Sequence, residues 1–134
     1  MNACFADTFF YIAMLDKHDQ HHERINNFIG KFDGFYVTTR WVLAEVANAL
    51  SDTPRRAAAS LLLQRLNDDP STLIVKSSDL LFEQGMSLYT GRQDKGWSLT
   101  DCISFVVMWE HRMNEVLTGD RHFQQAGFAP LFMD

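Results

Sequence analysis

The segment from Cys102 to Trp109 limits the possible folds more than any other part of the chain. Ser104 is its only polar residue, so a helix formed by this segment would be apolar on nearly every side. Helices of that kind are buried in the middle of a domain. Asp101 stands immediately before the segment, so the sequence predicts a carboxylate at the start of a buried helix.

Ser98 offers a structural explanation for this carboxylate. The Ser98-x-x-Asp101 spacing ahead of an apolar run is typical of a capping box in which Ser98 is the N-cap. A negative charge in the first turn is also favoured by the helix dipole. Taken alone, this stretch indicates a capped helix, and a chemical role for Asp101 requires signals from elsewhere in the chain.

Short apolar strands alternate with amphipathic helices along the rest of the sequence. The predicted strands are 4–6, 35–38, 73–75 and 116–118, with an edge strand within 128–133. The predicted helices are one turn after Asp7, then 21–32, 40–50 capped by Thr39, a helix that starts at Thr53-Pro54 and stops before Asp68, a helix from Ser77 or Ser78 through Tyr89, 98–113, and 121–126. This alternation implies a parallel sheet covered by helices on both faces.

Composition indicates one globular domain over residues 1–134, with 46% hydrophobic and 22% charged residues. No apolar run approaches the roughly 20 residues of a membrane span, and we expect no signal peptide. Cys4 and Cys102 lie in apolar settings and indicate reduced core thiols in a cytoplasmic protein. The net charge of −5 argues against nucleic-acid binding unless the acids are concentrated on bound cations.

Four carboxylates occupy positions that meet at one edge of such a sheet. Asp7 and Asp120 follow predicted strands, Asp101 opens a helix, and Glu45 lies in the second turn of another. Each has an ordinary interpretation alone, as a cap, an exposed acid or a loop residue. Ligands of open α/β sheets bind outside the carboxyl ends of the strands. Converging carboxylates repel one another unless a cation neutralises them, and oxygen ligands suit Mg²⁺ or Mn²⁺, which serve phosphate chemistry.

Four short motifs carry a family resemblance. They are Asp7-Thr8, Leu43-Ala44-Glu45-Val46, the block from Trp97 to Ser104, and the block from Thr118 to Phe123. In this order and over essentially the full length, the chain resembles PIN-domain nucleases. Within that family it is most similar to the VapC-type ribonuclease toxins of toxin–antitoxin pairs.

The resemblance implies a three-layer α/β/α sandwich whose central, mainly parallel sheet has four to five strands. It also implies cleavage of single-stranded or looped RNA that depends on Mg²⁺ or Mn²⁺, in which a metal-activated water leaves a 5′-phosphate and a 3′-hydroxyl. The implied metal ligands are Asp7, Glu45, Asp101 and Asp120. Thr8, Thr100 and Thr118 are candidates to orient the carboxylates, although they also suit strand ends and caps.

The same resemblance predicts RNA and protein partners. The candidate phosphate contacts are Arg40, Arg55, Arg56, Arg92, Lys95 and Arg121, and solvated surface charge is the alternative for each. The helix with Leu61, Leu62, Leu63 and Leu66 has surplus apolar surface. We therefore expect a homodimer, a cognate antitoxin, or both, to cover it. His122, close to Asp120, is interpreted as structural and not as a general base.

Three other functions agree with parts of the same sequence. A PIN nuclease acting in RNA processing has the same motifs as a toxin. A non-catalytic PIN-like binding module is less favoured, because such modules tend to lose acids and this chain keeps all four. A phosphoacceptor signalling domain requires an acidic pair at Asp7 and an acceptor Asp after the third strand, where Thr8 and Lys76-Ser77 stand instead.

Overall fold

The sheet of this protein is parallel throughout. The computed structural model describes residues 2–134, and its five strands run in the order β3-β2-β1-β4-β5 with every neighbouring pair parallel. The strands are β1 (Ala3–Ala6), β2 (Phe35–Thr39), β3 (Thr72–Val75), β4 (Glu115–Leu117) and β5 (Ala129–Pro130). The predicted parallel sheet is confirmed, with the edge strand reduced to two residues.

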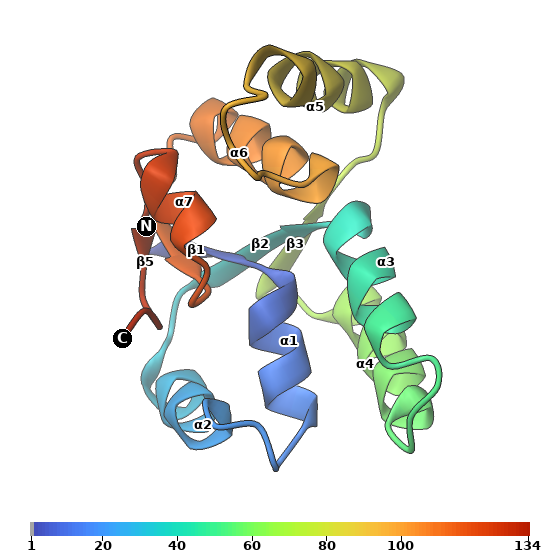
Figure 1. Cartoon of the computed structure of the whole chain (residues 1–134). Helices are drawn as coiled ribbons and strands as arrows, with labels where there is room; N and C mark the ends of the chain where they lie inside the picture. Colours follow the sequence, from blue (N-terminus) through green and yellow to red (C-terminus); the bar gives the residue numbers. More distant parts are fainter. Residues whose placement is uncertain (1) are drawn as a thin grey trace.

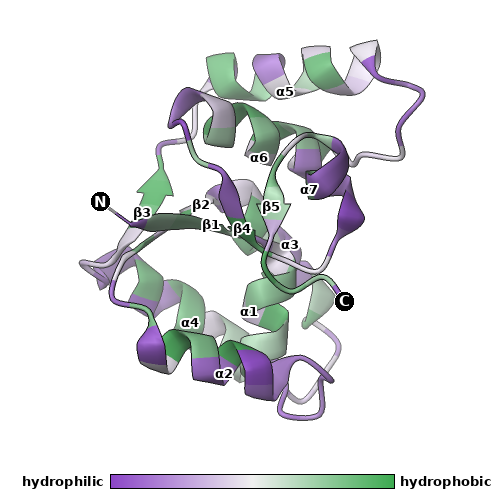
Figure 2. Cartoon of the chain, turned by 90° about the vertical axis from the view of Figure 1, so that its left-hand side faces the viewer, coloured by the Kyte–Doolittle hydropathy of each residue, from purple (hydrophilic) through white to green (hydrophobic). Residues whose placement is uncertain are grey.

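Helices cover both faces of the sheet, which confirms the three-layer α/β/α fold. They are α1 (Thr8–Leu15), α2 (His22–Lys31), α3 (Arg40–Ala49), α4 (Arg56–Asp68), α5 (Asp79–Gly91), α6 (Leu99–Glu110) and α7 (Arg121–Gln125). Figure 1 shows α5, α6 and α7 on one side of the sheet and α1 to α4 on the other. In the view of Figure 2 the sheet lies between these two layers, and α5 lies outside α6.

Helix α6 is the buried helix that the apolar segment predicts. Cys102, Ile103, Phe105, Val107 and Met108 are each 0% exposed. The helix ends at Glu110, earlier than the predicted end near residue 113. A residue with positive φ at position 112 turns the chain back. A backbone hydrogen bond from residue 113 to the carbonyl of residue 108 closes the end of the helix.

The length of one predicted helix and the start of another are corrected on the other face of the sheet. Helix α1 runs for eight residues, longer than the single turn expected after Asp7. Pro54 does not begin α4, because Thr53 forms a turn first. The hydroxyl of Thr53 accepts a hydrogen bond from the Arg55 N–H, and its carbonyl accepts one from the Arg56 N–H. The helix therefore starts two residues later than its sequence predicts.

The predicted caps at the other helix starts are confirmed. The hydroxyl of Thr39 accepts a hydrogen bond from the backbone of Val42, and Ser78, the second of the two candidate serines, caps α5. These caps follow strands or strand-end loops, so the helix starts gather at the carboxyl edge of the sheet. Within residues 2–134, no helix is long and apolar enough to cross a membrane.

Candidate active site

Asp7 is the innermost acid of the site. It follows β1, the middle strand of the sheet, and its side chain is only 6% exposed. Its Oδ2 accepts a hydrogen bond of 2.9 Å from the hydroxyl of Thr118, which is fully buried just after β4. Because β1 and β4 are paired neighbours, this bond ties the ends of two central strands together.

Burial changes the ionisation of Asp7. The pKa of its carboxyl is raised from 3.8 to about 7, chiefly by the loss of solvent and to a smaller extent by the negative charges of Asp101 and Glu45. Hydrogen bonds from the Thr8 backbone and the Thr118 hydroxyl oppose this rise only in part. A buried carboxylate beside two other acids is a setting that a cation would stabilise.

Asp101 has two roles at the start of α6. Its N–H donates to Ser98 Oγ at 3.0 Å, and the Ser98 N–H donates to Asp101 Oδ2 at 3.1 Å, so the predicted capping box is present. The same Oδ2 lies 3.0 Å from Nδ1 of His122. Burial raises the pKa of Asp101, while the hydrogen bonds from Ser98 and His122 lower it. The cap therefore holds a carboxylate whose oxygen also faces the site.

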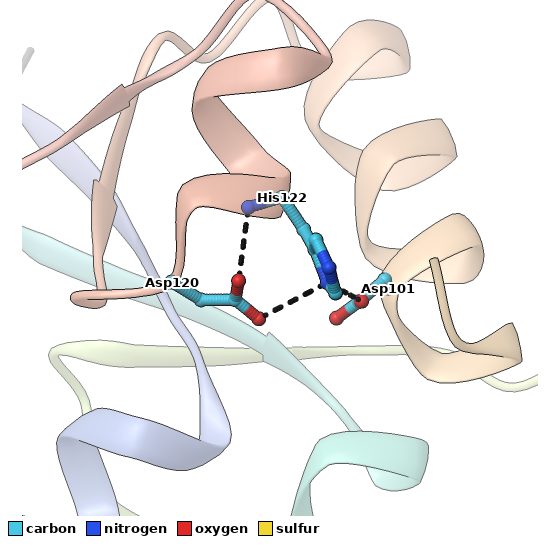
Figure 3. Close-up of side chains that lie close together, drawn as sticks. All are labelled: Asp101, Asp120 and His122. Atoms are coloured by element: carbon cyan, nitrogen blue, oxygen red, sulfur yellow. Dashed lines mark hydrogen bonds and ion pairs between the residues drawn. The ribbon is translucent and has the colours of Figure 1, made fainter. Parts of the chain in front are cut away.

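Asp120 is the N-cap of α7. Its Oδ1 accepts a hydrogen bond of 2.9 Å from the backbone of His122, and its own N–H donates to the Thr118 hydroxyl at 3.1 Å. Its Oδ2 is 3.4 Å from Nδ1 of His122. Figure 3 shows the imidazole between the carboxylates of Asp101 and Asp120. Thr118 thus contacts two of the four predicted acids.

Glu45 reaches the site from α3, on the opposite face of the sheet from α6. Its Oε1 accepts a hydrogen bond of 2.7 Å from the hydroxyl of Thr8. Its charge acts on Asp7, the residue before Thr8. The four acids are therefore neighbours in one region, linked by hydrogen bonds or by mutual repulsion.

The donor atoms of this region fit a divalent cation. One ligand atom each from Asp101, Asp120 and His122 lie within 4.8 Å of one another. Asp7 and Glu45 lie outside that tight group but add carboxylate oxygens beside it. The donor set is mostly carboxylate, which suits Mg²⁺ or Mn²⁺. His122 was not predicted as a donor, although its place two residues after Asp120 at a helix start could have indicated it.

Comparison with known proteins assigns the fold to a family. The sequence pattern of the PIN domain matches residues 4–129. The chain belongs to the PIN domain family. This membership confirms the resemblance to PIN-domain nucleases that the four acid motifs carry. No curated protein sequence matches the chain significantly.

A solved structure shares the whole PIN fold of this chain. VapC20 of Mycobacterium tuberculosis, described as a Sarcin-Ricin loop cleaving toxin, superposes with a TM-score of 0.87. The sequences are 21% identical, and the match covers 97% of this chain and 98% of the other. At that identity the likeness establishes the fold.

Two of the three predicted threonines contact acids of the candidate site. Thr8 binds Glu45, and Thr118 binds Asp7. For Thr100, the contact found is through its backbone, whose carbonyl accepts a hydrogen bond from Ser104. Thr100 therefore helps to hold α6 together.

The six candidate RNA-binding cations fall into separate groups. Arg40 and Arg121 are exposed first residues of α3 and α7, at the edge that carries the acids. Arg55 pairs with Asp16 at 2.9 Å, at the end of α1 opposite Asp7. Arg56 donates to a backbone carbonyl at the same far end.

The remaining two cations lie in the loop before α6. Arg92 pairs with Asp94 and lies over the Trp97 ring at 5.1 Å, and Lys95 is half-buried nearby. This loop leads directly to the capping serine of α6, so its cations are close in sequence to the site.

Proposed function

We propose that this PIN domain is a Mg²⁺- or Mn²⁺-dependent endoribonuclease and the toxin of a toxin–antitoxin pair. The observation that carries the proposal is the burial of Asp7 next to other carboxylates. Its pKa is raised to about 7 in a buried position, beside further carboxylates from α3 and α6. An acid kept there without a catalytic or binding role would cost stability, whereas a bound cation offsets both burial and repulsion.

Asp7, Glu45, Asp101 and Asp120 hold the ion in this proposal. When bound, the ion supplies a Lewis acid that lowers the pKa of water and neutralises charge on a phosphodiester. Thr8 and Thr118 keep Glu45 and Asp7 oriented through hydrogen bonds. Asp7 can bind a cation only after losing its proton, so ion binding and deprotonation are coupled.

RNA phosphates are held by cations around the acids. Arg40 and Arg121 are the best placed, because each begins a helix at the acidic edge and is exposed to solvent. Arg92 and Lys95 extend this surface from the loop before α6. Arg55 and Arg56 lie at the far end of α1 and α3, so we assign them a smaller part in RNA binding.

A groove between α3 and α4 is the proposed seat of an antitoxin segment. Its volume is about 550 Å³, and it is lined by apolar side chains such as Leu43, Ala47 and Leu63, with Arg40 and Arg56 on its walls. An amphipathic segment that carries acidic residues matches this lining. Arg40 also lies at the acidic edge, so a bound segment would reach toward the active site.

A homodimer is proposed through an exposed apolar face of α5. Phe82, Met86 and Tyr89 follow one another at helical spacing and are 41%, 37% and 47% exposed. Trp41 extends the face, with its ring centroid 6.4 Å from that of Phe82. In α4, where the surplus leucines predict a homodimer or an antitoxin site, Leu66 is buried in the core and Leu61 is 46% exposed.

Light scattering at micromolar concentration tests the dimer. We expect a dimer for the wild type and a monomer for Met86→Glu. The matched control is Leu61→Glu, which places the same charge on the exposed side of α4. A monomeric wild-type protein contradicts the homodimer.

RNA cleavage with Mg²⁺ or Mn²⁺, with and without chelator, tests the activity. We expect chelator, Asp7→Asn and Asp101→Asn each to reduce cleavage by about 100-fold or more, with folding retained. Asp33→Asn is the control, because that exposed acid precedes β2 at the opposite edge of the sheet. If both active-site variants cut like the wild type, the site assignment is wrong.

A nuclease of RNA processing is the alternative within the same chemistry. Expression in cells separates the two, because a toxin arrests growth and the product of an adjacent gene relieves the arrest. A processing nuclease that cleaves RNA without such toxicity contradicts the toxin half of the proposal. Absence of any cleavage favours the non-catalytic binding module.

A further inference from the structure

The imidazole of His122 is the only nitrogen donor in the tight group of ligand atoms found among residues 2–134. Its Nδ1 lies 3.0 Å from Asp101 Oδ2 and 3.4 Å from Asp120 Oδ2 (Figure 3). The ring is thus placed between the start of α6 and the start of α7. Neither carboxylate is reached by another histidine ring within the described chain.

The backbone around His122 gives the ring this orientation. The His122 N–H is bound to Asp120 Oδ1 at 2.9 Å, and Asp120 in turn is anchored by Thr118. The opposite ring nitrogen, Nε2, faces Gly96, where an added Cβ would lie 3.8 Å from it. The side that can bind an ion therefore points at the carboxylates, and the other side points at the loop before α6.

We propose that Nδ1 of His122 is a ligand of the same divalent ion as Asp101 and Asp120, and that it shifts the preference of the site toward Mn²⁺ over Mg²⁺. The inference rests on the proposed metal-dependent function. Donor atoms at adjacent positions around an ion with bonds of about 2.1 Å are about 3 Å apart. The separations of Nδ1 from the two carboxylate oxygens are close to that value.

The chemistry of the donor explains the expected preference. Imidazole suits transition metals, whereas Mg²⁺ favours oxygen ligands and retains its waters. A site made of carboxylates alone has little to distinguish Mg²⁺ from Mn²⁺. One nitrogen that replaces an oxygen or a water stabilises the Mn²⁺ complex more than the Mg²⁺ complex.

A positioning role is the competing explanation for the same distances. With its proton on Nδ1, the ring donates a hydrogen bond to Asp101 and only orients that carboxylate. Such a role would affect the binding of both ions alike. Direct ligation instead predicts a nitrogen bonded to Mn²⁺ and a change in the ratio of the two affinities.

Pulsed EPR of the protein loaded with Mn²⁺ separates these roles without relying on a variant. We expect the wild type to show the ¹⁴N modulation of a directly bound imidazole. His122→Ala should lose it. His111→Ala should keep it, since His111 lies at the far end of α6 and contacts the backbone of Val107. Bound Mn²⁺ without this modulation in the wild type overturns the inference and leaves the proposed function standing.

Calorimetric titration with each ion gives the second measurement. We expect His122→Ala to lower the Mn²⁺ affinity by about tenfold or more and the Mg²⁺ affinity by less than about threefold. An equal loss for both ions overturns the metal preference. A wild-type protein that binds neither ion contradicts the proposed function itself, which is a different result from Mn²⁺ binding without nitrogen.

Discussion

The hydroxyl of Thr8 donates a hydrogen bond of 2.7 Å to Oε1 of Glu45, and so joins the first residue of α1 to the second turn of α3. The two residues are 37 positions apart in sequence. The bond orients a half-buried acid that would otherwise be free to turn into solvent. Together with the bond between Thr118 and Asp7, it makes hydroxyl groups the supports of the acidic site.

Removing this support should weaken the site without unfolding the protein. We expect Thr8→Val to lower divalent-ion affinity and RNA cleavage by about tenfold, because Glu45 loses the donor that orients it. Thr8→Ser keeps the hydroxyl and should behave like the wild type. Calorimetry with Mn²⁺ and a cleavage assay provide the measurements. Equal affinity in the valine variant would show that Glu45 needs no such support.

The buried carboxyl of Asp7 should make stability depend on pH. Its pKa is about 7 in the folded state and near 3.8 when exposed, so the folded state binds the proton more tightly. The contribution of the protonated group is complete below about pH 4 and is lost as pH rises to about 7. In chelator, we therefore expect the free energy of unfolding of the wild type to fall between about pH 4 and pH 7, because Asp7 loses its proton over this interval.

Asp7→Asn isolates that contribution. The variant lacks the buried charge, so in chelator at pH 8 its Tm should exceed that of the wild type by about 3 °C or more. Added Mn²⁺ should reverse the order, because it binds the ionised wild-type carboxylate. Thermal melts at pH 5 and pH 8, with and without the ion, measure both effects. A variant less stable than the wild type at pH 8 in chelator would contradict the role of burial.

The capping box of α6 should contribute to stability separately from chemistry. Ser98→Ala removes the oxygen that accepts from the Asp101 N–H, and we expect it to lower the free energy of unfolding by about 1 kcal/mol. The Ser98 N–H remains in the variant and still binds the Asp101 carboxylate. Cleavage should therefore fall far less than in Asp101→Asn. Urea unfolding and the cleavage assay, with Ser98→Thr as the conservative control, check this separation.

Two helical glycines should respond in opposite directions to alanine. Gly85 in α5 lies against Ile103 of α6, so a Cβ there clashes with a buried side chain, and Gly85→Ala should destabilise by about 1–3 kcal/mol. Gly30 in α2 has open space around it, so Gly30→Ala should stabilise by about 0.5–1 kcal/mol. Urea unfolding compares the two. If Gly85→Ala is as stable as Gly30→Ala, the close contact of α5 with α6 is wrong.

The parts of the structure that were predictable depend on local chemistry. The caps made by Ser98 and Thr39 are recognisable because each hydroxyl accepts a hydrogen bond from a backbone N–H only three residues further along the chain. The start of α4 was not predictable in the same way. Pro54 suits the first position of a helix. The backbone N–H groups of Arg55 and Arg56 instead bind Thr53 in a turn, so the helix begins at Arg56.

Local signals along the chain were enough to predict the alternation of strands and helices, the buried helix α6 and the position of each acid relative to the elements. These follow from apolar periodicity, strand ends and caps, which act over a few residues. Three contacts of the site could not be predicted in this way. Thr8 supports Glu45, Thr118 contacts both Asp7 and Asp120, and the His122 ring faces Asp101. Such contacts depend on the order and register of a parallel sheet, which bring together side chains that lie far apart along the chain.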